Sequence, residues 1–334
     1  MNASDSMLRL DSSEHPALTV VLTNRCPAQC AHCGTFGGPG NRPVLTLPVL
    51  TRLFSEAEAR GCDFVNFTGG EPMILEQLLL DAVAEARRRE FLVRVTSNAY
   101  WSPDEASARE RLEPLAAAGL RQLFISSSDE HLEFVPLDNL LHATAVARSL
   151  GIDVYLCVTT TKHSKLTSRS VREFFRNAHL PPPWILESPV IPFGRAAENI
   201  DENEYILSDV PTEPTPCNSM KLHPTIQADG LITPCAVLFA RDCSALHFGN
   251  LHERSFAEVM GEIESNALVN WIHSVGVVAL KQTVEHNSNI VMGKRYANIC
   301  HLCYDILSRQ DVLQLLDILG IGRQNTLQAK PCCN

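Results

Sequence analysis

The sequence has 334 residues, of which 45% are hydrophobic, a content typical of globular proteins rather than of disordered chains. Its 38 acidic and 28 basic residues give a net charge of −10, which argues against nucleic acid as a partner. No apolar stretch approaches the roughly 20 residues that span a bilayer, and residues 1–15 lack the pattern of a secretory signal. We therefore expect a cytoplasmic protein with no membrane partner.

Short β-branched runs alternate with longer amphipathic stretches after an N-terminal extension over residues 1–17. This alternation predicts repeated βα units around a parallel sheet. The expected strands are residues 18–22, 64–67, 92–96, 122–126, 154–158 and 184–187. The expected helices are residues 47–60, 75–89, 103–118, 137–150 and 166–177.

The predicted fold is α/β, a partial (β/α)6 TIM-like barrel over residues 18–210 with a small C-terminal auxiliary-cluster domain. Such barrels place functional residues in the loops that follow the strands. A proline-rich passage at 211–216 separates the barrel from the second domain, which we expect over residues 211–320, with a tail over 321–334.

Three cysteines follow the first strand in a CxxxCxxC spacing: Cys26, Cys30 and Cys33. Twelve cysteines in a reducing compartment indicate metal or redox chemistry rather than disulfides. Three thiolates suit three irons of a 4Fe-4S cluster and leave the fourth iron open to an external molecule. A zinc site or unrelated buried thiols are the alternatives. His32 is expected to pack beside the cluster rather than to bind it.

A glycine-rich loop follows the second strand, with Gly69, Gly70 and Glu71 in the sequence TGGEP. Two glycines let the backbone approach a ligand closely, and a carboxylate lies beside them. Such a loop suits an ammonium group, although Gly-Gly-Glu alone is more often a plain turn. Its position one βα unit after the cysteines gives it more weight.

The triplet after strand one and Gly-Gly-Glu-Pro after strand two resemble the radical S-adenosylmethionine (AdoMet, SAM) superfamily over roughly residues 18–197. By that resemblance the open iron binds the amino and carboxylate groups of the methionine part of AdoMet. Gly69, Gly70 and Glu71 are then expected to contact the methionine amino group.

The same resemblance implies further AdoMet contacts at Asn98, Ser126 and Ser128, which end strands three and four. Ordinary loop capping is the alternative for these three residues. The segment 192–196, PFGRA, resembles the Pro-x-Gly-Arg-Ala segment of a subset of the family, and its backbone is expected to border the adenine.

The activity implied by the resemblance is reductive cleavage of AdoMet to methionine and a 5′-deoxyadenosyl radical, which abstracts hydrogen from a small-molecule or peptide substrate. A reductant such as flavodoxin or ferredoxin is the implied partner. In such enzymes the cofactor carries the hard chemistry. No Ser-His-Asp or HExxH arrangement stands out in the sequence.

A second set of cysteines lies beyond the expected boundary: Cys217, Cys235, Cys300 and Cys303. Gly230 is expected to permit a hairpin turn that brings the first two together. By spacing alone, an auxiliary 4Fe-4S cluster and a four-cysteine zinc site are almost equally favoured. The C-x12-G-x4-C spacing and the segment 248–251 resemble the SPASM and Twitch extensions of radical SAM enzymes, which favours the cluster, in the shorter Twitch type.

Cys243 lies in the second domain without an assigned partner, and it is either a structural thiol or a hydrogen donor to a substrate radical. Cys62 and Cys157 are expected to be core residues. Cys332 and Cys333 are interpreted as a tail, with a metal-binding tail or a redox pair as alternatives. An insertion at 271–292 has no chemical interpretation.

Two reactions remain open. An auxiliary cluster that accepts an electron from the substrate radical predicts oxidation, by dehydrogenation or crosslinking, of a natural-product type of substrate, whereas a thiol donor predicts epimerisation. A non-catalytic iron–sulfur protein that carries electrons or assembles clusters is the alternative from another class. Only about 17 residues precede the first strand, so a separate peptide-recognition protein or a small-molecule substrate is expected.

Overall fold

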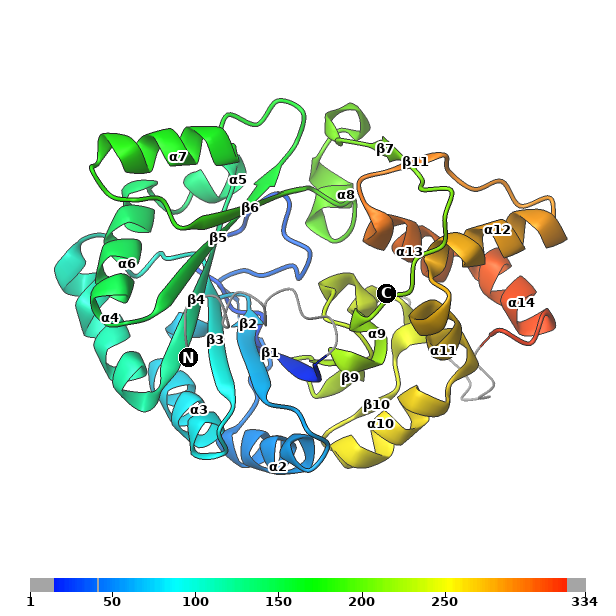
Figure 1. Cartoon of the computed structure of the whole chain (residues 1–334), viewed down its shortest axis with the longest axis horizontal. Coiled ribbons are helices and arrows are strands. Elements are labelled where there is room, and N and C mark those ends of the chain that lie inside the picture. The colour runs from blue at the N-terminus through cyan, green and yellow to red at the C-terminus, as the bar shows by residue number, and fades with distance from the viewer. Residues whose placement is uncertain (1–14, 41, 323–334) are drawn as a thin grey trace.

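The computed structural model describes residues 15–40 and 42–322. It contains a nine-stranded sheet with the order β10-β9-β8-β1-β2-β3-β4-β5-β6, in which β1 to β6 run parallel. Figure 1 shows these strands curving around one side of the molecule with helices on the outside. The observed architecture is therefore the α/β partial barrel that the sequence predicts.

All six predicted strands are confirmed. Their bounds are β1 Ala17–Thr23, β2 Phe64–Gly69, β3 Leu92–Ser97, β4 Leu120–Ser127, β5 Asp153–Thr160 and β6 Trp184–Pro189. β-branched residues favour these pleated, mostly buried segments. The five predicted helices are also present, as α2 Leu47–Glu58, α3 Glu76–Arg88, α4 Glu105–Ala118, α6 Asp138–Ser149 and α7 Ser168–Asn177.

The outer helices are attached to the sheet by apolar side chains. Phe54 of α2 lies 6.0 Å from Phe67 of β2 and 5.8 Å from Phe91, measured between ring centroids, and all three are fully buried. Aromatic contacts of this kind add to the free energy gained by apolar burial. The helices thus hold the strand ends, and the loops after them, in fixed positions.

The sheet continues into the C-terminal part of the chain. β8 (Thr225–Ile226) pairs in parallel with β1, where Thr19 lies opposite Thr225, and antiparallel with β9 (Leu231–Thr233). The β8–β9 hairpin confirms the predicted turn, in which Gly230 has φ of +86°. β10 (Gly249–Asn250) completes this edge. One sheet therefore spans the expected boundary near residue 210, and that division into domains stays a prediction.

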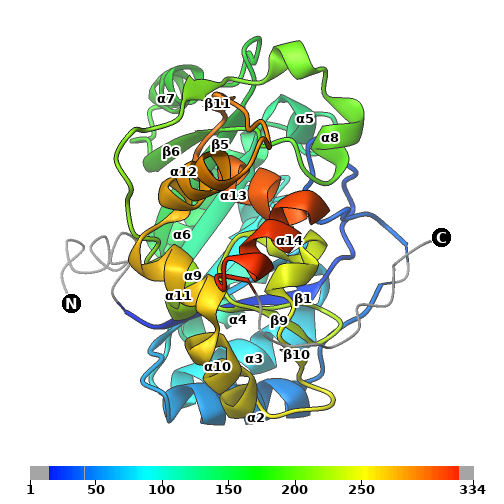
Figure 2. The same ribbon diagram turned by 90° about the vertical axis from the view of Figure 1, so that its right-hand side faces the viewer.

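The remaining C-terminal elements are helical, apart from a ribbon of β7 (Ser208–Asp209) and β11 (Arg295–Tyr296). Figure 2 shows the C-terminal helices in front of the barrel strands. They are α9 Ser219–Leu222, α10 Phe256–Ser265, α11 Ala267–Ser274, α12 Val277–Asn287, α13 Ile299–Ser308 and α14 Gln310–Ile318. The shorter helices are α5 Asp129–Leu132, α8 Arg195–Asn199, and the 3-10 turns Pro72–Ile74, Glu202–Glu204, Leu238–Asp242 and Ser244–Leu246.

Two sequence expectations can be placed against this architecture. The insertion at 271–292 forms the end of α11 and all of α12, which packs against α13 and α14. In the part of the chain that the structure describes, no helix is long and apolar enough to cross a membrane. The interpretation of Cys332 and Cys333 as a tail falls outside the described residues.

Candidate functional site

The cysteine triplet lies in the loop that follows β1. Cys26 and Cys30 are buried and pack with Ala28 and the half-buried Cys33 in a small group of their own. The loop folds back on itself, because Cys26 N donates a hydrogen bond to Gly38 O at 2.9 Å and Cys33 N donates to Cys30 O at 3.1 Å. The loop therefore gathers the three thiols into one small region of the molecule.

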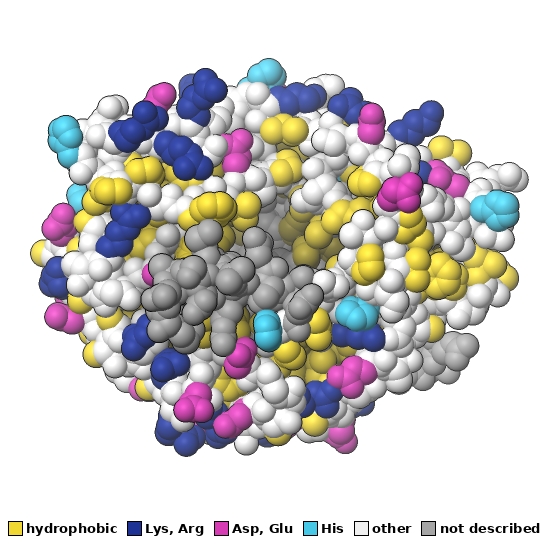
Figure 3. Space-filling view, viewed as in Figure 1, with side chains coloured by type: hydrophobic (Ala, Val, Ile, Leu, Met, Phe, Trp, Pro, Cys, Tyr) yellow, Lys and Arg dark blue, Asp and Glu magenta, His cyan; other side chains and the backbone are white. Residues whose placement is uncertain are grey.

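These three cysteines line a cavity of ≈ 190 Å³ at the carboxyl ends of the parallel strands. Its other lining residues are Ala28, His32, Gly34, Thr35, Thr68, Gly69, Gly70, Thr96, Ser97, Asn98, Ser126, His131, Thr159 and Arg195. Loops after successive parallel strands meet at this edge of a barrel, where such folds carry their functional sites. Figure 3, which has the view of Figure 1, shows a hollow bordered by hydrophobic side chains near the centre of the face toward which the strands turn their amino ends.

The thiols are held in surroundings that disfavour a free thiolate. Burial, followed by the Glu71 carboxylate and the Cys33 thiol, raises the pKa of Cys26 to about 12. Burial and the other two thiols raise the pKa of Cys30 to about 12 as well. Since metals bind the thiolate form, positive charge is needed beside these sulfurs to deprotonate them.

Several N–H groups already point at the sulfurs. Ala28 N donates to Cys26 Sγ at 3.4 Å, Gly37 N donates to Cys33 Sγ at 3.4 Å, and Asn98 Nδ2 donates to Cys26 Sγ at 3.5 Å. Hydrogen bonds to cysteine sulfurs are among the factors that set iron–sulfur potentials. The donors therefore suit sulfurs that carry negative charge.

The two glycines of the loop after β2 are required by close backbone packing. A Cβ atom on Gly69, which has φ of +146°, would lie 2.2 Å from Thr23 O, and one on Gly70 would lie 2.3 Å from Arg25 O. Gly70 N donates to Thr23 O at 2.7 Å. The glycine loop thus rests directly on the start of the cysteine loop, whereas the sequence interpretation gave the glycines a close approach to a ligand.

The carboxylate of Glu71 does not lie where the sequence predicts it, beside the ligand. It is fully buried and is not among the residues that line the cavity. Its Oε1 accepts a hydrogen bond from Met73 N at 3.0 Å and its Oε2 accepts one from Asn98 N at 2.8 Å. The carboxylate therefore fastens the loops after β2 and β3 together, and the backbone N–H of Glu71 donates to Arg25 O at 2.8 Å.

The three polar residues expected after strands three and four divide into two groups. Asn98 and Ser126 line the cavity. Ser128 is fully buried outside the lining and accepts a hydrogen bond from His131 N at 3.2 Å as the cap of α5. The capping alternative is thus the one that fits Ser128.

His32 pairs with a carboxylate rather than with the sulfurs. Its Nδ1 lies 3.3 Å from Glu130 Oε2, and its ring centroid lies 4.9 Å from that of His131. The expectation that His32 packs beside the cysteines agrees with this arrangement. His131 is a lining residue that sequence reasoning missed, because nothing in its surroundings in the chain marks it.

Arg195 was identified only as part of the segment 192–196, and its side chain has a more specific place. Nε donates to Cys30 O at 2.9 Å, and Arg195 N donates to Cys33 O at 3.1 Å. Nη2 is buried and has no hydrogen-bond partner. A buried donor without a partner is costly, so this atom points to a ligand in the cavity.

The second cysteine set is brought together by the β8–β9 hairpin and α13. Cys303 is fully buried, and burial together with Cys235, Cys300, Cys217 and Cys243 raises its pKa well above the usual range. Each of these four thiols therefore lies close enough to act on Cys303 electrostatically. The four predicted auxiliary cysteines form one neighbourhood.

Cys243 belongs to that neighbourhood too. Its thiol is 1% exposed, interacts electrostatically with Cys235, and does not line the triplet cavity. Cys243 thus lies close to the four auxiliary cysteines, and its role as a structural thiol or a hydrogen donor stays a prediction. Cys243 lies between two 3-10 turns, which no simple pattern in the sequence predicts.

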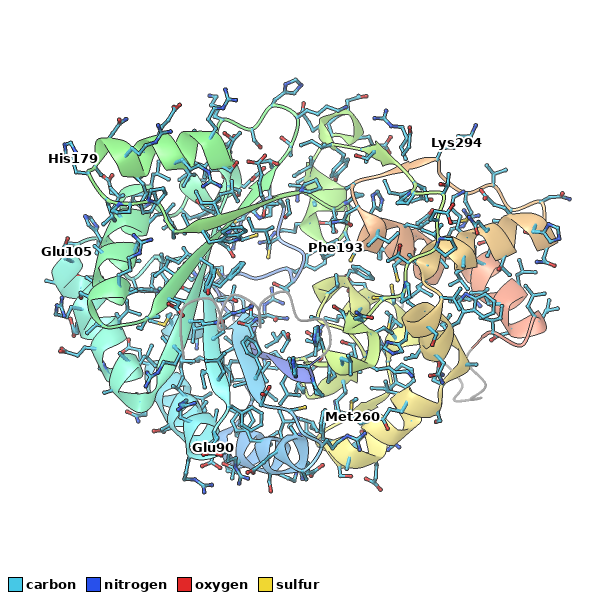
Figure 4. All side chains as sticks on the ribbon, in the orientation of Figure 1. Glu90, Glu105, His179, Phe193, Met260 and Lys294 are labelled. Carbon is cyan, nitrogen blue, oxygen red and sulfur yellow. The ribbon has the colours of Figure 1, made fainter. Side chains whose placement is uncertain are left out.

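Aromatic rings fill the space between the two cysteine sets. The Phe193 ring lies against Gly34, where an added Cβ would meet Cε2 of Phe193 at 2.1 Å. Ring centroids of Phe193 and Phe239 are 5.7 Å apart, and those of Phe239 and Tyr304 are 5.4 Å apart. Figure 4 shows Phe193 near the centre, between the barrel and the C-terminal helices. Rings thus connect the residue after Cys33 with the residue after Cys303.

Neither set of cysteine thiols has the geometry of ligands to a single metal ion. Among the residues that the structure describes, no group of three or more His, Cys, Asp or Glu side chains is arranged to hold one metal ion. A tetrahedral zinc site would hold its sulfurs about 3.8 Å apart. The donors of a 4Fe-4S cluster bind different irons and are spread further apart.

Comparison with protein families identifies one match: residues 20–178 match the Radical SAM superfamily. This range includes the triplet, the glycine loop and the polar residues after β3 and β4.

Curated relatives share a single name. The GTP 3′,8-cyclase of Synechococcus elongatus is 35% identical over 117 residues, which are 33% of this chain and 33% of that protein. The GTP 3′,8-cyclase of Rhodopseudomonas palustris is 24% identical over 263 residues, which are 70% of this chain and 75% of that protein. The chain thus spans a third of the first relative and three quarters of the second.

Solved structures agree on the fold. Native anSMEcpe with bound AdoMet has a TM-score of 0.53 at 11% identity, over 88% of this chain and 91% of that chain. Native anSMEcpe with bound AdoMet and the Cp18Cys peptide has a TM-score of 0.52 at 12% identity, over 91% and 100%. At such identities the likeness concerns the fold alone.

Proposed function

Because the chain belongs to the radical SAM superfamily, we propose that it cleaves AdoMet reductively at the cavity lined by Cys26, Cys30 and Cys33. The observation that carries this proposal is the meeting of three thiols and two glycines at one cavity. Enzymes of this superfamily use a 4Fe-4S cluster and AdoMet. When bound here, the reduced cluster would supply the electron that splits AdoMet into methionine and a 5′-deoxyadenosyl radical.

The residues present fit that cofactor pair. Three soft thiol donors in one loop match three irons and leave one open. The backbone at Gly69 and Gly70 lies open to the cavity and offers carbonyl groups to the methionine amino group. Asn98 and Ser126 border the same space. Arg195, whose Nη2 lacks a protein partner, offers a donor to a carboxylate or to a cluster sulfide.

For the second site we propose an auxiliary 4Fe-4S cluster held by Cys217, Cys235, Cys300 and Cys303. Four thiols in one neighbourhood, those of Cys235 and Cys303 buried and those of Cys217 and Cys300 half-buried, support this assignment. When bound, such a cluster would supply an acceptor for one electron. The rings of Phe193, Phe239 and Tyr304 lie against one another between the two sites.

Oxidation is the reaction that we favour. A substrate that loses a hydrogen atom to the 5′-deoxyadenosyl radical, then an electron to the auxiliary site and a proton to a base or to water, leaves oxidised by two electrons. Cys243 lies among the auxiliary cysteines and away from the cavity lining, which supports a structural role over hydrogen donation. Epimerisation with Cys243 as donor is therefore the second candidate.

The substrate proposed is a small molecule or a peptide, and a flavodoxin or ferredoxin is proposed as reductant. The curated relatives carry the name GTP 3′,8-cyclase, so GTP is the first compound to supply in turnover assays. A cyclised GTP product would replace two-electron oxidation as the reaction of this chain.

Iron counting tests the two sites separately. Anaerobically reconstituted protein should hold about eight irons, four for each cluster. A Cys26→Ala, Cys30→Ala, Cys33→Ala triple variant should hold about four, and so should a Cys217→Ala, Cys235→Ala double variant. Cys62→Ala, which removes a buried thiol that belongs to neither set, is the matched control. Zinc in place of iron in wild-type protein would refute both assignments.

Deuterated water tests the reaction. An epimerase takes up deuterium at the reacting carbon and loses this label in Cys243→Ala. Two-electron oxidation of the substrate gives a product that has lost two hydrogen atoms and carries no deuterium at the reacting carbon. Label that depends on Cys243 would overturn the oxidative proposal in favour of the second candidate.

A further inference from the structure

A second cavity, of ≈ 300 Å³, lies along the inner side of the sheet. It shares three lining residues, Thr68, Thr96 and Ser126, with the cavity of the cysteine triplet, so the two spaces adjoin. Most of its wall is made of side chains that project from β1 to β5 toward the barrel interior. A molecule that reaches from the AdoMet cavity into the barrel would therefore enter this space.

Arg94 of β3 brings a positive charge into this wall. Its guanidinium donates twice to Gln122 Oε1, from Nε at 3.1 Å and from Nη2 at 2.9 Å. It also lies 4.7 Å from the ring centroid of Phe64 and 5.5 Å from that of Phe124. These contacts fix the plane of the guanidinium and leave Nη1 without a protein acceptor in the described part of the chain.

No carboxylate balances this charge. Within residues 15–40 and 42–322, no acidic side chain forms an ion pair with Arg94, although Asp63 lines the same cavity. Burial lowers the pKa of Arg94 to about 10, which leaves the group charged at neutral pH. A largely buried charge without a counter-ion costs free energy, and a protein retains it most readily where a ligand supplies the opposite charge.

The groups around Arg94 suit an anion. Asn66 lies beside it on β2, where its Oδ1 accepts from Thr96 Oγ1 and its Nδ2 is a neutral donor, and Ser126 adds a neutral hydroxyl on the same wall. They can bond to an anionic oxygen without adding negative charge of their own. The planar fork of an arginine matches carboxylate and phosphate groups.

We propose that Arg94 binds an anionic group of the substrate, a carboxylate or a phosphate, inside the barrel. This inference rests on the proposed function, because it takes the anion to be part of the molecule that reacts at the AdoMet cavity. Arg94 is two residues before Thr96, about 7 Å along the strand. The anionic group therefore lies at the end of the substrate that is remote from AdoMet.

The test is anion binding by the reconstituted holoprotein without AdoMet. Thermal unfolding is followed in sodium phosphate, sodium pyrophosphate or sodium acetate, with sodium chloride at equal ionic strength as reference. We expect one class of anion to raise the melting temperature of wild-type protein in a saturable way. Arg94→Gln should weaken the apparent affinity at least tenfold, whereas Arg172→Gln, which removes an exposed arginine of α7, should leave it unchanged.

Asn66→Asp provides a second test if Arg94→Gln fails to fold. The new carboxylate keeps the acceptor for Thr96 Oγ1, which now donates to Asn66 Oδ1 at 2.9 Å, and supplies a fixed counter-ion beside Arg94. Anion stabilisation should be lost in Asn66→Asp, while the melting temperature in chloride should rise or stay the same.

The possible results distinguish a phosphate from a carboxylate ligand, and they test the anion site separately from the proposed function. Stabilisation by phosphate or pyrophosphate identifies a phosphorylated substrate, and stabilisation by acetate alone identifies a carboxylate. The inference is overturned if no anion stabilises wild-type protein. It is also overturned if anions stabilise Arg94→Gln and Asn66→Asp as strongly as they stabilise wild-type protein. Failure of wild-type protein to cleave AdoMet would instead refute the proposed function, because anion binding is measured without AdoMet.

Discussion

Glu71 Oε2 accepts a hydrogen bond from Asn98 N at 2.8 Å, and so joins the loop after β2 to the loop after β3. The second oxygen of Glu71 accepts from Met73 N. Asn98 in turn donates through its side chain to Cys26 Sγ. One buried carboxylate thus connects the glycine loop, the third strand and the first cysteine.

Replacing Glu71 with Gln is expected to destabilise the protein. Both carboxylate oxygens accept from backbone N–H groups, so an amide would turn its NH2 group toward one of these donors. A buried backbone donor left unpaired costs about 1–3 kcal/mol. Urea unfolding measures this loss, and Glu253→Gln, at an exposed glutamate, is the control. Equal stability of Glu71→Gln and wild type at pH 5, where the difference is expected to be largest, would contradict the fastening role.

The stability of wild-type protein should depend on pH through Glu71. Burial raises its pKa from the ordinary 4.5 to about 7. Between these values the folded protein binds more protons at this site than the unfolded chain, so stability falls as pH rises from about 4.5 to about 7 and is level above.

The difference in unfolding free energy between wild type and Glu71→Gln isolates this effect. It should decrease by about 2–3 kcal/mol from pH 5 to pH 8, since one pKa unit corresponds to about 1.4 kcal/mol. Urea titrations at four pH values measure it. A difference that stays constant over this range would show that Glu71 titrates as an ordinary carboxyl.

Gly70→Ala should prevent the glycine loop from resting on the cysteine loop. The new methyl group would lie 2.3 Å from Arg25 O, which is backbone and cannot rotate away. Overpacking of this kind costs about 1–3 kcal/mol, and we expect iron bound at the triplet to decrease with it. Gly40→Ala is the control in the same loop region, because a Cβ there meets nothing within 4 Å. Full iron content in Gly70→Ala would count against the packing argument.

Asn98→Leu should make the triplet cluster harder to reduce. The side-chain N–H of Asn98 donates to Cys26 Sγ at 3.5 Å, and a hydrogen bond to a ligating sulfur stabilises the reduced, more negative cluster. A redox titration followed by electron paramagnetic resonance should give a more negative potential than wild type. Asn287→Ala, at an exposed residue of α12, should not change it. A more positive potential in Asn98→Leu would exclude the assigned contact.

Sequence patterns predicted the local parts of this structure. β-branched runs indicated the six parallel strands, and the two glycines were identified by their position after the second strand, although the backbone that they approach, that of Thr23 and Arg25, was not predicted. Pairings between distant segments were not predictable: β8 has two residues and no periodicity, yet Thr225 lies opposite Thr19. For the same reason the direction of the Glu71 carboxylate, the burial of Arg94 and the place of Cys243 required the folded chain.

Formation of 5′-deoxyadenosine tests the central claim most directly. Reconstituted wild-type protein is incubated with AdoMet and dithionite under anaerobic conditions, beside Cys30→Ala and Cys62→Ala, and the nucleoside is quantified by chromatography. We predict that wild type and Cys62→Ala form 5′-deoxyadenosine and methionine in equal amounts and that Cys30→Ala forms none above background. Equal product from Cys30→Ala and wild type, or no product from wild type, would contradict the account.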